Sequence, residues 1–312
     1  MHTSTIGKLK RYLLVFIFLM NGLGMVFAQD TVTTEQPVKK PLEKAPFESG
    51  FFIADRTVVM PPARTLEFFI QHDFGSIQNH WGDLYGIWGA SNIRIGCNYT
   101  LNKNVEIGFG TTKNKMFQDL SVKYTFLRQQ KGGGIPVTMA VYGNIAASAA
   151  KGWDKYTGAK FDGGDTSYSI INRICYYGEL MIARRFCKEF SAQLSIGWVH
   201  YNIVDSAVMS NNHVSNNMRN NNLNIAGIGR IKVSPQTSVL LSYSQPVLTY
   251  VNTAPWPNFG VGVEISTSTH AFQIFLTSAQ GLIPQETVMN NNNNPYNGAI
   301  LLGFNITRLW TF

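Results

Sequence analysis

His213 and Ser215 are a pair of side chains whose types and spacing could form a general base and a nucleophile. They stand two residues apart in His213-Val214-Ser215, so on a strand they would share one face. The pair lies inside residues 210–224, SNNHVSNNMRNNNLN, a stretch rich in asparagine. A solvated loop of this kind holds a nucleophile and its base poorly within hydrogen-bond distance. The sequence therefore predicts no catalytic residue, and we expect a protein that is not an enzyme.

Motifs for metals and cofactors are also missing from the sequence. His72 and Asp73 are adjacent, so on a strand they would point to opposite faces. No H-x-H, H-E-x-x-H or D-x-D offers a metal site. The three cysteines form neither a C-x-x-C motif nor a disulfide framework; they are Cys97, Cys175 and Cys187. We therefore expect no metal and no cofactor.

A larger set of polar side chains stands opposite apolar stripes in segments that alternate with a period of two. The set comprises Glu67, Gln71, Asp73, Arg94, Asn98, Glu106, Arg173, Arg230, Glu264 and Gln273. If the apolar stripes contact lipid, these residues face the lumen of a barrel, where charges must be paired or hydrated. They could line a pore or form a structural network of ion pairs that fills the lumen. The pattern leaves both interpretations open.

The composition indicates the environment of the segments that carry these polar residues. The chain has 312 residues, of which 45% are hydrophobic, 12% are aromatic and only 14% are charged. In soluble domains about a quarter of all residues are charged, so part of the surface of this chain must contact something other than water. No apolar run reaches the roughly 18 residues of a membrane helix. This combination favours an all-β transmembrane barrel, whose strands give only a weak alternating signal.

The net charge of +8 does not point to nucleic acid. Lys8, Lys10 and Arg11 belong to a segment that we expect to be removed, and the remaining charge is spread along the chain. No basic run interleaved with aromatic residues is present, so no nucleic-acid partner is expected.

The first 64 residues divide into two parts. Residues 1–28 are typical of a secretory signal peptide, with a basic start, an apolar core at 12–20 (YLLVFIFLM) and small residues before Gln29. Residues 29–48 hold three prolines and many charges, which is a linker composition. Short apolar pieces at 51–53 and 58–60 follow. We interpret residues 29–64 as a periplasmic linker or a plug.

From Thr65 onward the alternation predicts a closed antiparallel barrel of about twelve strands, built from residues 65–312. In residues 104–112, for example, Val105, Ile107 and Phe109 oppose a glutamate and two glycines. The expected strands are 65–74, 91–101, 104–112, 117–127, 135–149, 167–184, 188–202, 222–233, 237–246, 258–267, 270–279 and 298–312.

The connections between these strands alternate between short and long. The second, fourth, sixth, eighth and tenth connections are short, whereas the others are long except for residues 113–116. A barrel with both termini in the periplasm predicts this order, with short turns inside and long loops outside. A soluble sandwich has no reason to segregate loop length in this way. We therefore expect a location in the cell outer membrane, with its lipid and the barrel assembly machinery as partners.

The last segment, residues 298–312 (GAILLGFNITRLWTF), has the features of a closing strand. Its length exceeds the roughly 9–11 residues that a tilted strand needs to cross a bilayer. We expect it to pair with residues 65–74 and to place Phe312 at the periplasmic rim as an assembly signal. Arg308 is a charged residue on the otherwise apolar face of this segment, and we interpret its side chain as extending to the membrane–water interface.

Four segments carry a resemblance to a known family: residues 65–75 (TLEFFIQHDFG), 92–96 with the hairpin to 105–110, 123–129 (KYTFLRQ) and 270–281 (HAFQIFLTSAQG). They resemble a family of Bacteroidota outer-membrane β-barrels whose domain has no known function, over roughly residues 45–312. Members of that family end the first strand with His-Arg-Phe-Gly, whereas this chain has His72-Asp73-Phe74-Gly75. The resemblance implies a barrel in the outer membrane and supplies no activity and no catalytic residue.

Two functions remain open on these grounds. The polar inner faces and long loops favour a porin-like, passive channel for small solutes. The alternative is a non-conducting structural or interaction barrel with a periplasmic protein partner. Barrels of about 8 strands are filled and those of 16–18 strands carry open channels, so a count of twelve does not decide between them.

Overall fold

The computed structural model describes residues 40–150, 160–161, 170–204, 206–208, 213–216, 219–248 and 255–312. The expected signal peptide, residues 1–28, lies outside the described residues, as does the first part of the linker. The backbone of His213 and Ser215 belongs to a short strand, β12 (His213–Asn216), but their side chains are not described.

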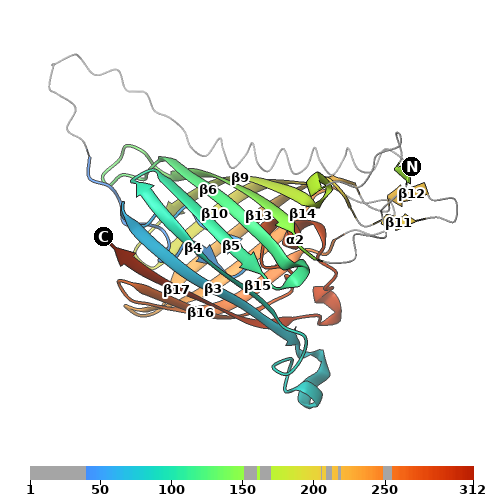
Figure 1. Ribbon diagram of the computed structural model, residues 1–312. Coiled ribbons are helices and arrows are strands. Elements are labelled where there is room, and N and C mark those ends of the chain that lie inside the picture. The colour runs from blue at the N-terminus through green and yellow to red at the C-terminus, as the bar shows by residue number, and fades with distance from the viewer. Residues whose placement is uncertain are drawn as a thin grey trace, which may run out of the picture. The chain divides into compact units, whose positions relative to one another are not determined.

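Twelve antiparallel strands close into one barrel, as the alternation predicts (Figure 1). Each strand pairs with its neighbours along the chain, and the last pairs with the first. In chain order they are β3 (Thr65–Ser76), β4 (Asn92–Asn102), β5 (Val105–Thr112), β6 (Phe117–Leu127), β7 (Thr138–Ser148), β9 (Ile174–Arg185), β10 (Phe190–Tyr201), β13 (Asn221–Lys232), β14 (Thr237–Pro246), β15 (Asn258–Ser266), β16 (His270–Thr277) and β17 (Leu301–Thr311).

Alternation along each strand separates a buried polar face from an exposed apolar face. In β6 the buried residues include Asp119 and Lys123, whereas Leu120 is 59% exposed and Val122 is 48% exposed. The same order of burial recurs around the barrel. An exposed belt of large apolar side chains around a polar interior is the arrangement that a lipid environment requires of a barrel.

Short turns gather at one end of the barrel, the turn end, and long connections at the other, the loop end. The turns at the turn end are 103–104, 128–137, 186–189, 233–236 and 267–269. The loop end carries 77–91, 113–116, 149–173, 202–220, 247–257 and 278–300. The predicted parity is confirmed, including the short loop at 113–116, where η2 (Asn114–Met116) makes the turn.

Small elements decorate the long loops. They are η1 (Ile77–Asp83), β8 (Lys160–Phe161), η4 (Ile170–Arg173), β11 (Ser206–Val208), β12, α2 (Pro284–Met289) and η5 (Pro295–Asn297). The strands β8, β11 and β12 form a separate three-stranded sheet that joins two of the loops. No helix in the described ranges is long and apolar enough to cross a membrane.

The seam of the barrel lies between β17 and β3, where the sequence places it. Thr311 pairs with Thr65 and Phe304 pairs with His72, with one irregularity near Leu301. Phe312 ends the chain at the turn end and is 77% exposed, and its N–H donates to the carbonyl of Arg64. The guanidinium of Arg308 lies 4.8 Å from the centre of the Trp310 ring on the outer face.

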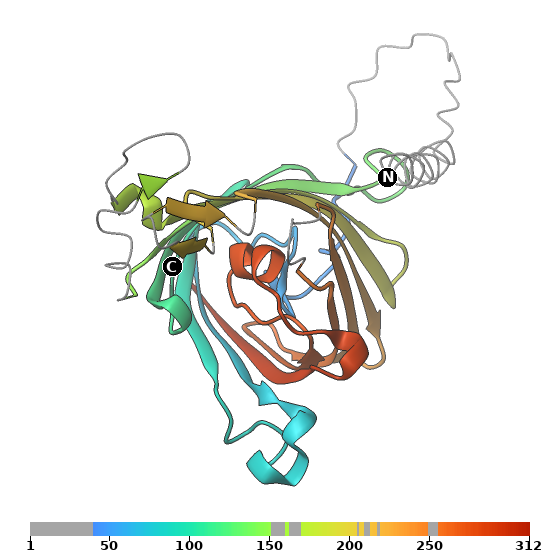
Figure 2. The ribbon, with the colours of Figure 1, turned by 90° about the vertical axis from the view of Figure 1, so that its right-hand side faces the viewer.

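Two chain segments fill the interior of the barrel, and the main apolar core lies there (Figure 2). The N-terminal insert, residues 47–60, contains a two-stranded hairpin of β1 (Phe51–Phe52) and β2 (Asp55–Arg56). The loop insert, residues 279–291, carries α2, all six residues of which are buried. In Figure 2, which looks in from the loop end, the red helix α2 and the blue N-terminal segment lie inside the ring of strands.

The N-terminal insert enters and leaves the barrel at the turn end. Before it, Leu42 forms an isolated bridge with Gln130 in the β6–β7 turn. After it, the N–H of Arg64 donates to the carbonyl of Thr100 near the turn end of β4. The insert is therefore a loop into the lumen, with both of its ends at one opening.

Candidate functional site

Nine of the ten polar residues singled out by the alternation are buried on the inner face of the wall. They are Glu67, Gln71, Asp73, Arg94, Asn98, Glu106, Arg230, Glu264 and Gln273. Arg173 is the exception, because β9 begins at Ile174 and not at residue 167. Arg173 belongs to η4 at the loop end and is only partly buried, so it stands outside the strands of the wall.

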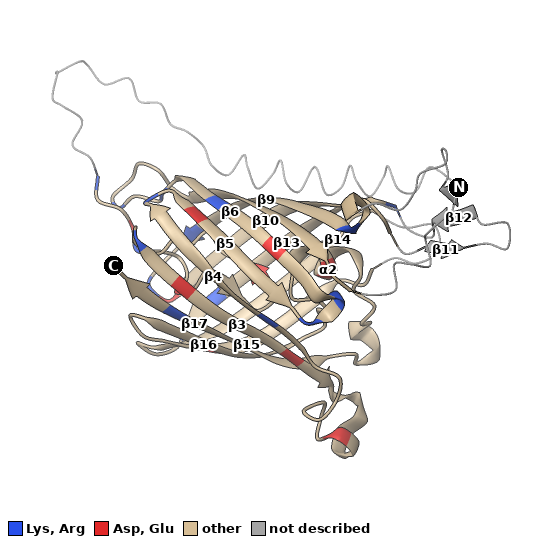
Figure 3. Ribbon diagram, in the orientation of Figure 1, with Lys and Arg blue, Asp and Glu red and all other residues tan. Residues whose placement is uncertain are grey.

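Six residues on β3 to β6 form a network that we call the wall cluster: Glu67, Arg94, Asn98, Glu106, Asp119 and Lys123. Arg94 binds Asp119 through two nitrogens, at 2.6 and 3.0 Å, and donates a third hydrogen bond to Gln71. Lys123 pairs with Glu106 at 3.0 Å. The amide of Asn98 donates to Glu67 at 2.8 Å. Of these neighbouring strands, β3 and β5 carry acidic residues, β4 carries a basic one and β6 carries one of each (Figure 3).

The wall cluster is nearly free of water contact, because the side chain of Arg94 is 1% exposed and that of Asp119 is fully buried. Breaking a buried pair by removing one partner costs about 3–5 kcal/mol, since the other charge stays behind. The Arg94–Asp119 pair therefore fixes the relative positions of β4 and β6 across the intervening β5.

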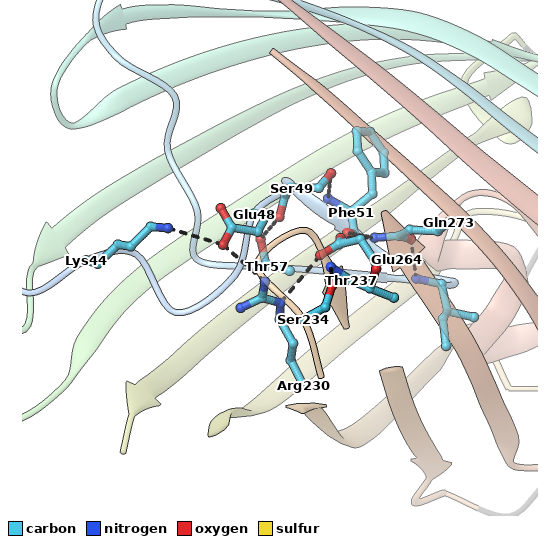
Figure 4. Close-up of polar contacts among 11 residues, drawn as sticks. Lys44, Glu48, Ser49, Phe51, Thr57, Arg230, Ser234, Thr237, Glu264 and Gln273 are labelled. Carbon is cyan, nitrogen blue, oxygen red and sulfur yellow. Dashed lines mark hydrogen bonds and ion pairs between the residues drawn. The ribbon is translucent and has the colours of Figure 1, made fainter. Parts of the chain in front are cut away.

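A second network ties the N-terminal insert to the opposite wall (Figure 4). Arg230 of β13 lies 3.1 Å from Glu48 of the insert and 3.4 Å from Glu264 of β15. Gln273 of β16 donates both to Glu264, at 2.8 Å, and to the carbonyl of Phe51, at 2.9 Å. The insert is thus linked to three neighbouring parts of the wall by charged and amide groups.

Amide side chains of the wall bind the backbone of the hairpin. The oxygen of Gln273 accepts from the N–H of Ile53, and Asn305 donates to the Ile53 carbonyl. On the far side, Gln193 accepts from the N–H of Val58 and donates to the carbonyl of Arg56. The sequence prediction missed Gln193 and Asn305, although both stand on inward-facing positions of their strands.

The turn of the hairpin holds an unusual backbone conformation. Ile53 has φ 55°, a left-handed region that a β-branched residue rarely adopts. Its peptide groups are the ones that Gln273 and Asn305 bind, and its side chain lies against Gly260, where a Cβ atom would come within 2.9 Å. Strain of this kind persists where surrounding contacts over-determine it, and the wall amides supply those contacts.

Two charged residues of the hairpin, Asp55 and Arg56, face different surroundings. The guanidinium of Arg56 lies 4.0 Å from the ring centre of Phe51, 5.2 Å from that of Tyr142 and 5.9 Å from that of Phe69. Burial raises the pKa of Asp55 to about 7, and a hydrogen bond with Ser242 opposes part of that rise.

The loop insert is anchored through Glu286. Its carboxylate accepts from Lys115 at 3.1 Å, from the hydroxyl of Tyr201 at 2.7 Å and from the amide of Asn290 at 2.7 Å. The neighbouring Gln285 donates to the side chain of Asn144 at 2.6 Å. These side-chain contacts hold α2 across the loop end of the lumen.

A cavity of about 150 Å³ lies between the N-terminal insert and the wall at the turn end. Its lining includes Glu48 of the insert and Glu67 of the wall cluster, together with the turn before β16. Among the residues that the structure describes, no three histidine, cysteine, aspartate or glutamate side chains come together as a metal site.

Residues 47–310 match the family described as a membrane bound beta barrel domain, DUF5777. The chain belongs to this family. The match covers the wall and both inserts, and with the apolar outer belt and the even number of antiparallel strands it makes this chain an outer-membrane β-barrel protein. No curated protein matches the sequence.

Several solved barrels have a similar fold to this member of the membrane bound beta barrel family. The match to the NanC porin spans 79% of this chain and 99% of the porin chain, at 9% identity and a TM-score of 0.46. The match to the COG4313 outer membrane channel from Pseudomonas putida F1 spans 81% of this chain and 97% of the channel chain, at 11% identity and a TM-score of 0.48. The match to the KdgM porin spans 80% of this chain and 99% of the porin chain, at 5% identity and a TM-score of 0.42. At these identities and TM-scores, the similarity does not indicate which solute or activity this chain has.

Proposed function

We propose that this protein is a channel for small polar solutes that is closed by its own N-terminal insert. The turn end faces the periplasm and the loop end faces the exterior, as the positions of the short turns and long loops favour. Solutes then pass by diffusion when the N-terminal insert is displaced from the lumen. The wall carries out no chemistry, because its charged residues bind one another and the inserts.

The observation that supports this proposal most is how the hairpin is held. Gln193, Gln273 and Asn305 bind its backbone with their amide groups. When the hairpin leaves, water can bind the same amides, so the wall stays satisfied in both states. Two accessible arrangements of one segment are what a gate requires.

Conductance of the refolded protein in planar bilayers tests the proposal. The full chain is compared with a variant that lacks residues 47–60 and with Phe52→Asp, which places a charge where Phe52 is now 1% exposed. We expect a low conductance from the full chain and a several-fold larger one from both variants. Heat-modifiable migration on gels reports that each barrel is folded. Folded variants that conduct no more than the full chain would falsify the channel.

A second candidate is the non-conducting interaction barrel with a periplasmic protein partner. It is favoured by residues 40–44, which lie at the turn end with the exposed Lys40 and Lys44. In that case deletion of residues 29–62 abolishes co-purification of the partner. Unchanged recovery of the partner counts against this candidate.

A further inference from the structure

The charges of the lumen wall do not balance without the N-terminal insert. In the described strands, six carboxylates are buried on the wall, whereas only three cationic side chains are. The carboxylates are Glu67, Asp73, Glu106, Asp119, Glu179 and Glu264, and the cations are Arg94, Lys123 and Arg230. The wall by itself therefore attracts cations.

The imbalance recurs within the wall cluster. Arg94 is paired with Asp119 and Lys123 with Glu106, whereas the third carboxylate, that of Glu67, shares the charge of Lys123 and forms no ion pair of its own in the described part of the chain. Its hydrogen bond comes from the neutral amide of Asn98. The hairpin supplies the third cation, because Arg56 lies close enough for its charge to act on both Glu67 and Asp119.

The place that Arg56 occupies has the groups that recognise a planar organic cation. The rings of Phe69 and Tyr142 belong to the wall and lie 5.9 and 5.2 Å from its guanidinium. An aromatic face within about 6 Å attracts a cation, and the attraction grows where water is excluded. Phe69 already accepts one guanidinium on its ring, that of Arg94 at 4.6 Å. The seat of Arg56 thus combines aromatic faces with an excess carboxylate.

We propose that this seat, formed by Phe69, Tyr142 and Glu67, is a binding site for a small solute with a guanidinium or amidinium group, which Arg56 occupies while the channel is closed. The proposal rests on the channel function and names its solute class. A solute of this kind competes with Arg56 for the same rings and carboxylate. The opened channel accordingly prefers cations, and among them planar organic cations bind.

Arg56→Ala in the full chain tests the site directly, because it empties the seat and leaves the rest of the hairpin in place. Lys44→Ala is the matched control, since Lys44 is an exposed cation just before the insert. Binding of methylguanidinium to both variants in detergent is measured by calorimetry, with methylammonium and the neutral urea as comparison probes. We expect Arg56→Ala to bind methylguanidinium at least about tenfold more tightly than Lys44→Ala does. Equal binding by the two variants overturns the proposal.

Two further substitutions in the Arg56→Ala background separate binding from a general loss of structure. Tyr142→Phe keeps the aromatic ring, whereas Tyr142→Leu removes it. We expect methylguanidinium to bind the first about as well as the Arg56→Ala parent and the second about tenfold more weakly. If both substitutions change binding equally, the ring of Tyr142 is not part of the site.

Bilayer recordings of the variant that lacks residues 47–60 keep this proposal distinct from the channel proposal. Its reversal potential in a salt gradient is expected to show a preference for cations, and millimolar methylguanidinium should lower the potassium current. A folded variant that conducts without either effect refutes the cation site and leaves the channel standing. A folded variant that does not conduct refutes the channel, while the calorimetry still decides whether the cation site exists.

Discussion

The two inserts close the same lumen from opposite ends, but the wall holds them by different kinds of contact. The loop insert depends on its own side chains, above all Glu286, which binds three partners from its own loop and from two other parts of the chain. The backbone of the N-terminal insert is bound by Gln193, Gln273 and Asn305, and its apolar side chains pack in the core of the lumen. The loop insert is also joined to wall strands at both ends, β16 and β17.

In the proposed channel, this difference separates a fixed constriction from a removable one. Side-chain contacts that converge on one carboxylate specify α2 in one position. Backbone contacts from wall amides specify the shape of the hairpin, while its buried apolar side chains and Arg56 are the parts of its sequence that the lumen selects. We infer that substitutions on the hairpin change how long the channel stays closed, whereas substitutions at Glu286 change the geometry of the loop end.

The largest effect on this comparison is expected from Gln273→Ala. It leaves the N–H of Ile53, the carbonyl of Phe51 and the carboxylate of Glu264 without a hydrogen bond that each now has. Unsatisfied buried groups cost about 1–3 kcal/mol each, so the seated hairpin loses roughly 3 kcal/mol or more. Hydrogen exchange of the amides at 51–58 measures the loss. Gln118→Ala on the exposed face of β6 is the control, and equal exchange in both variants contradicts the assignment.

A pH dependence should distinguish the hairpin from the loop insert. The folded pKa of Asp55, about 7, lies above its ordinary value of 3.8, so the protonated form is favoured in the seated hairpin. The stabilisation is present at low pH and is lost as the pH rises from about 4 through about 7. The charged groups around Asp55 include Arg56 and Glu179, and Tyr177 lies among them. Channel opening should therefore increase between about pH 4 and about pH 7, and Asp55→Asn should remove that increase. A profile unchanged by this substitution assigns the dependence to another group.

A smaller effect is expected from Glu286→Gln, which keeps the shape of the side chain. The ion pair with Lys115 is lost, whereas the hydroxyl of Tyr201 can still donate to the amide oxygen. Because Lys115 is 43% exposed and can be hydrated, we expect a loss of about 1 kcal/mol or less. Proteolysis within residues 278–300 should become faster, while hydrogen exchange at 51–58 stays the same. A change at both inserts would mean that they open together.

The wall could be predicted from the sequence because it follows a local rule. Period-two alternation placed the strands, most of them within about two residues, and the parity of the connections placed the two ends. The same rule put nine of the ten polar candidates on the inner face. Arg173 stands outside the strands of the wall, because residues 170–173 form a 3-10 turn before β9 begins.

The inserts could not be predicted in the same way, because their places depend on contacts between distant residues. Residues 51–53 and 58–60 form two short apolar pieces with no period, and the wall amides that bind them are between 135 and 252 residues away. The asparagine-rich stretch 290–294 suggests a solvated loop, yet Asn291 is fully buried and its side chain donates to the carbonyl of Trp256. Local composition alone does not show that a polar loop folds inward.

The course of the N-terminal insert, in and out through one opening, determines how the protein responds to mechanical load. A pull on Lys40 from the turn end acts first on the bridge between Leu42 and Gln130 and then on the arm that holds Glu48. Phe51 and the turn at Ile53 follow, and the arm that holds Val58 is last. The bonds to the wall therefore break one after another, as in unzipping, and not together, as in shear. None of the ladder bonds between wall strands lies in this path, because β3 follows the second arm. In the proposed channel, the insert is therefore drawn out one contact at a time while the barrel that surrounds it stays closed.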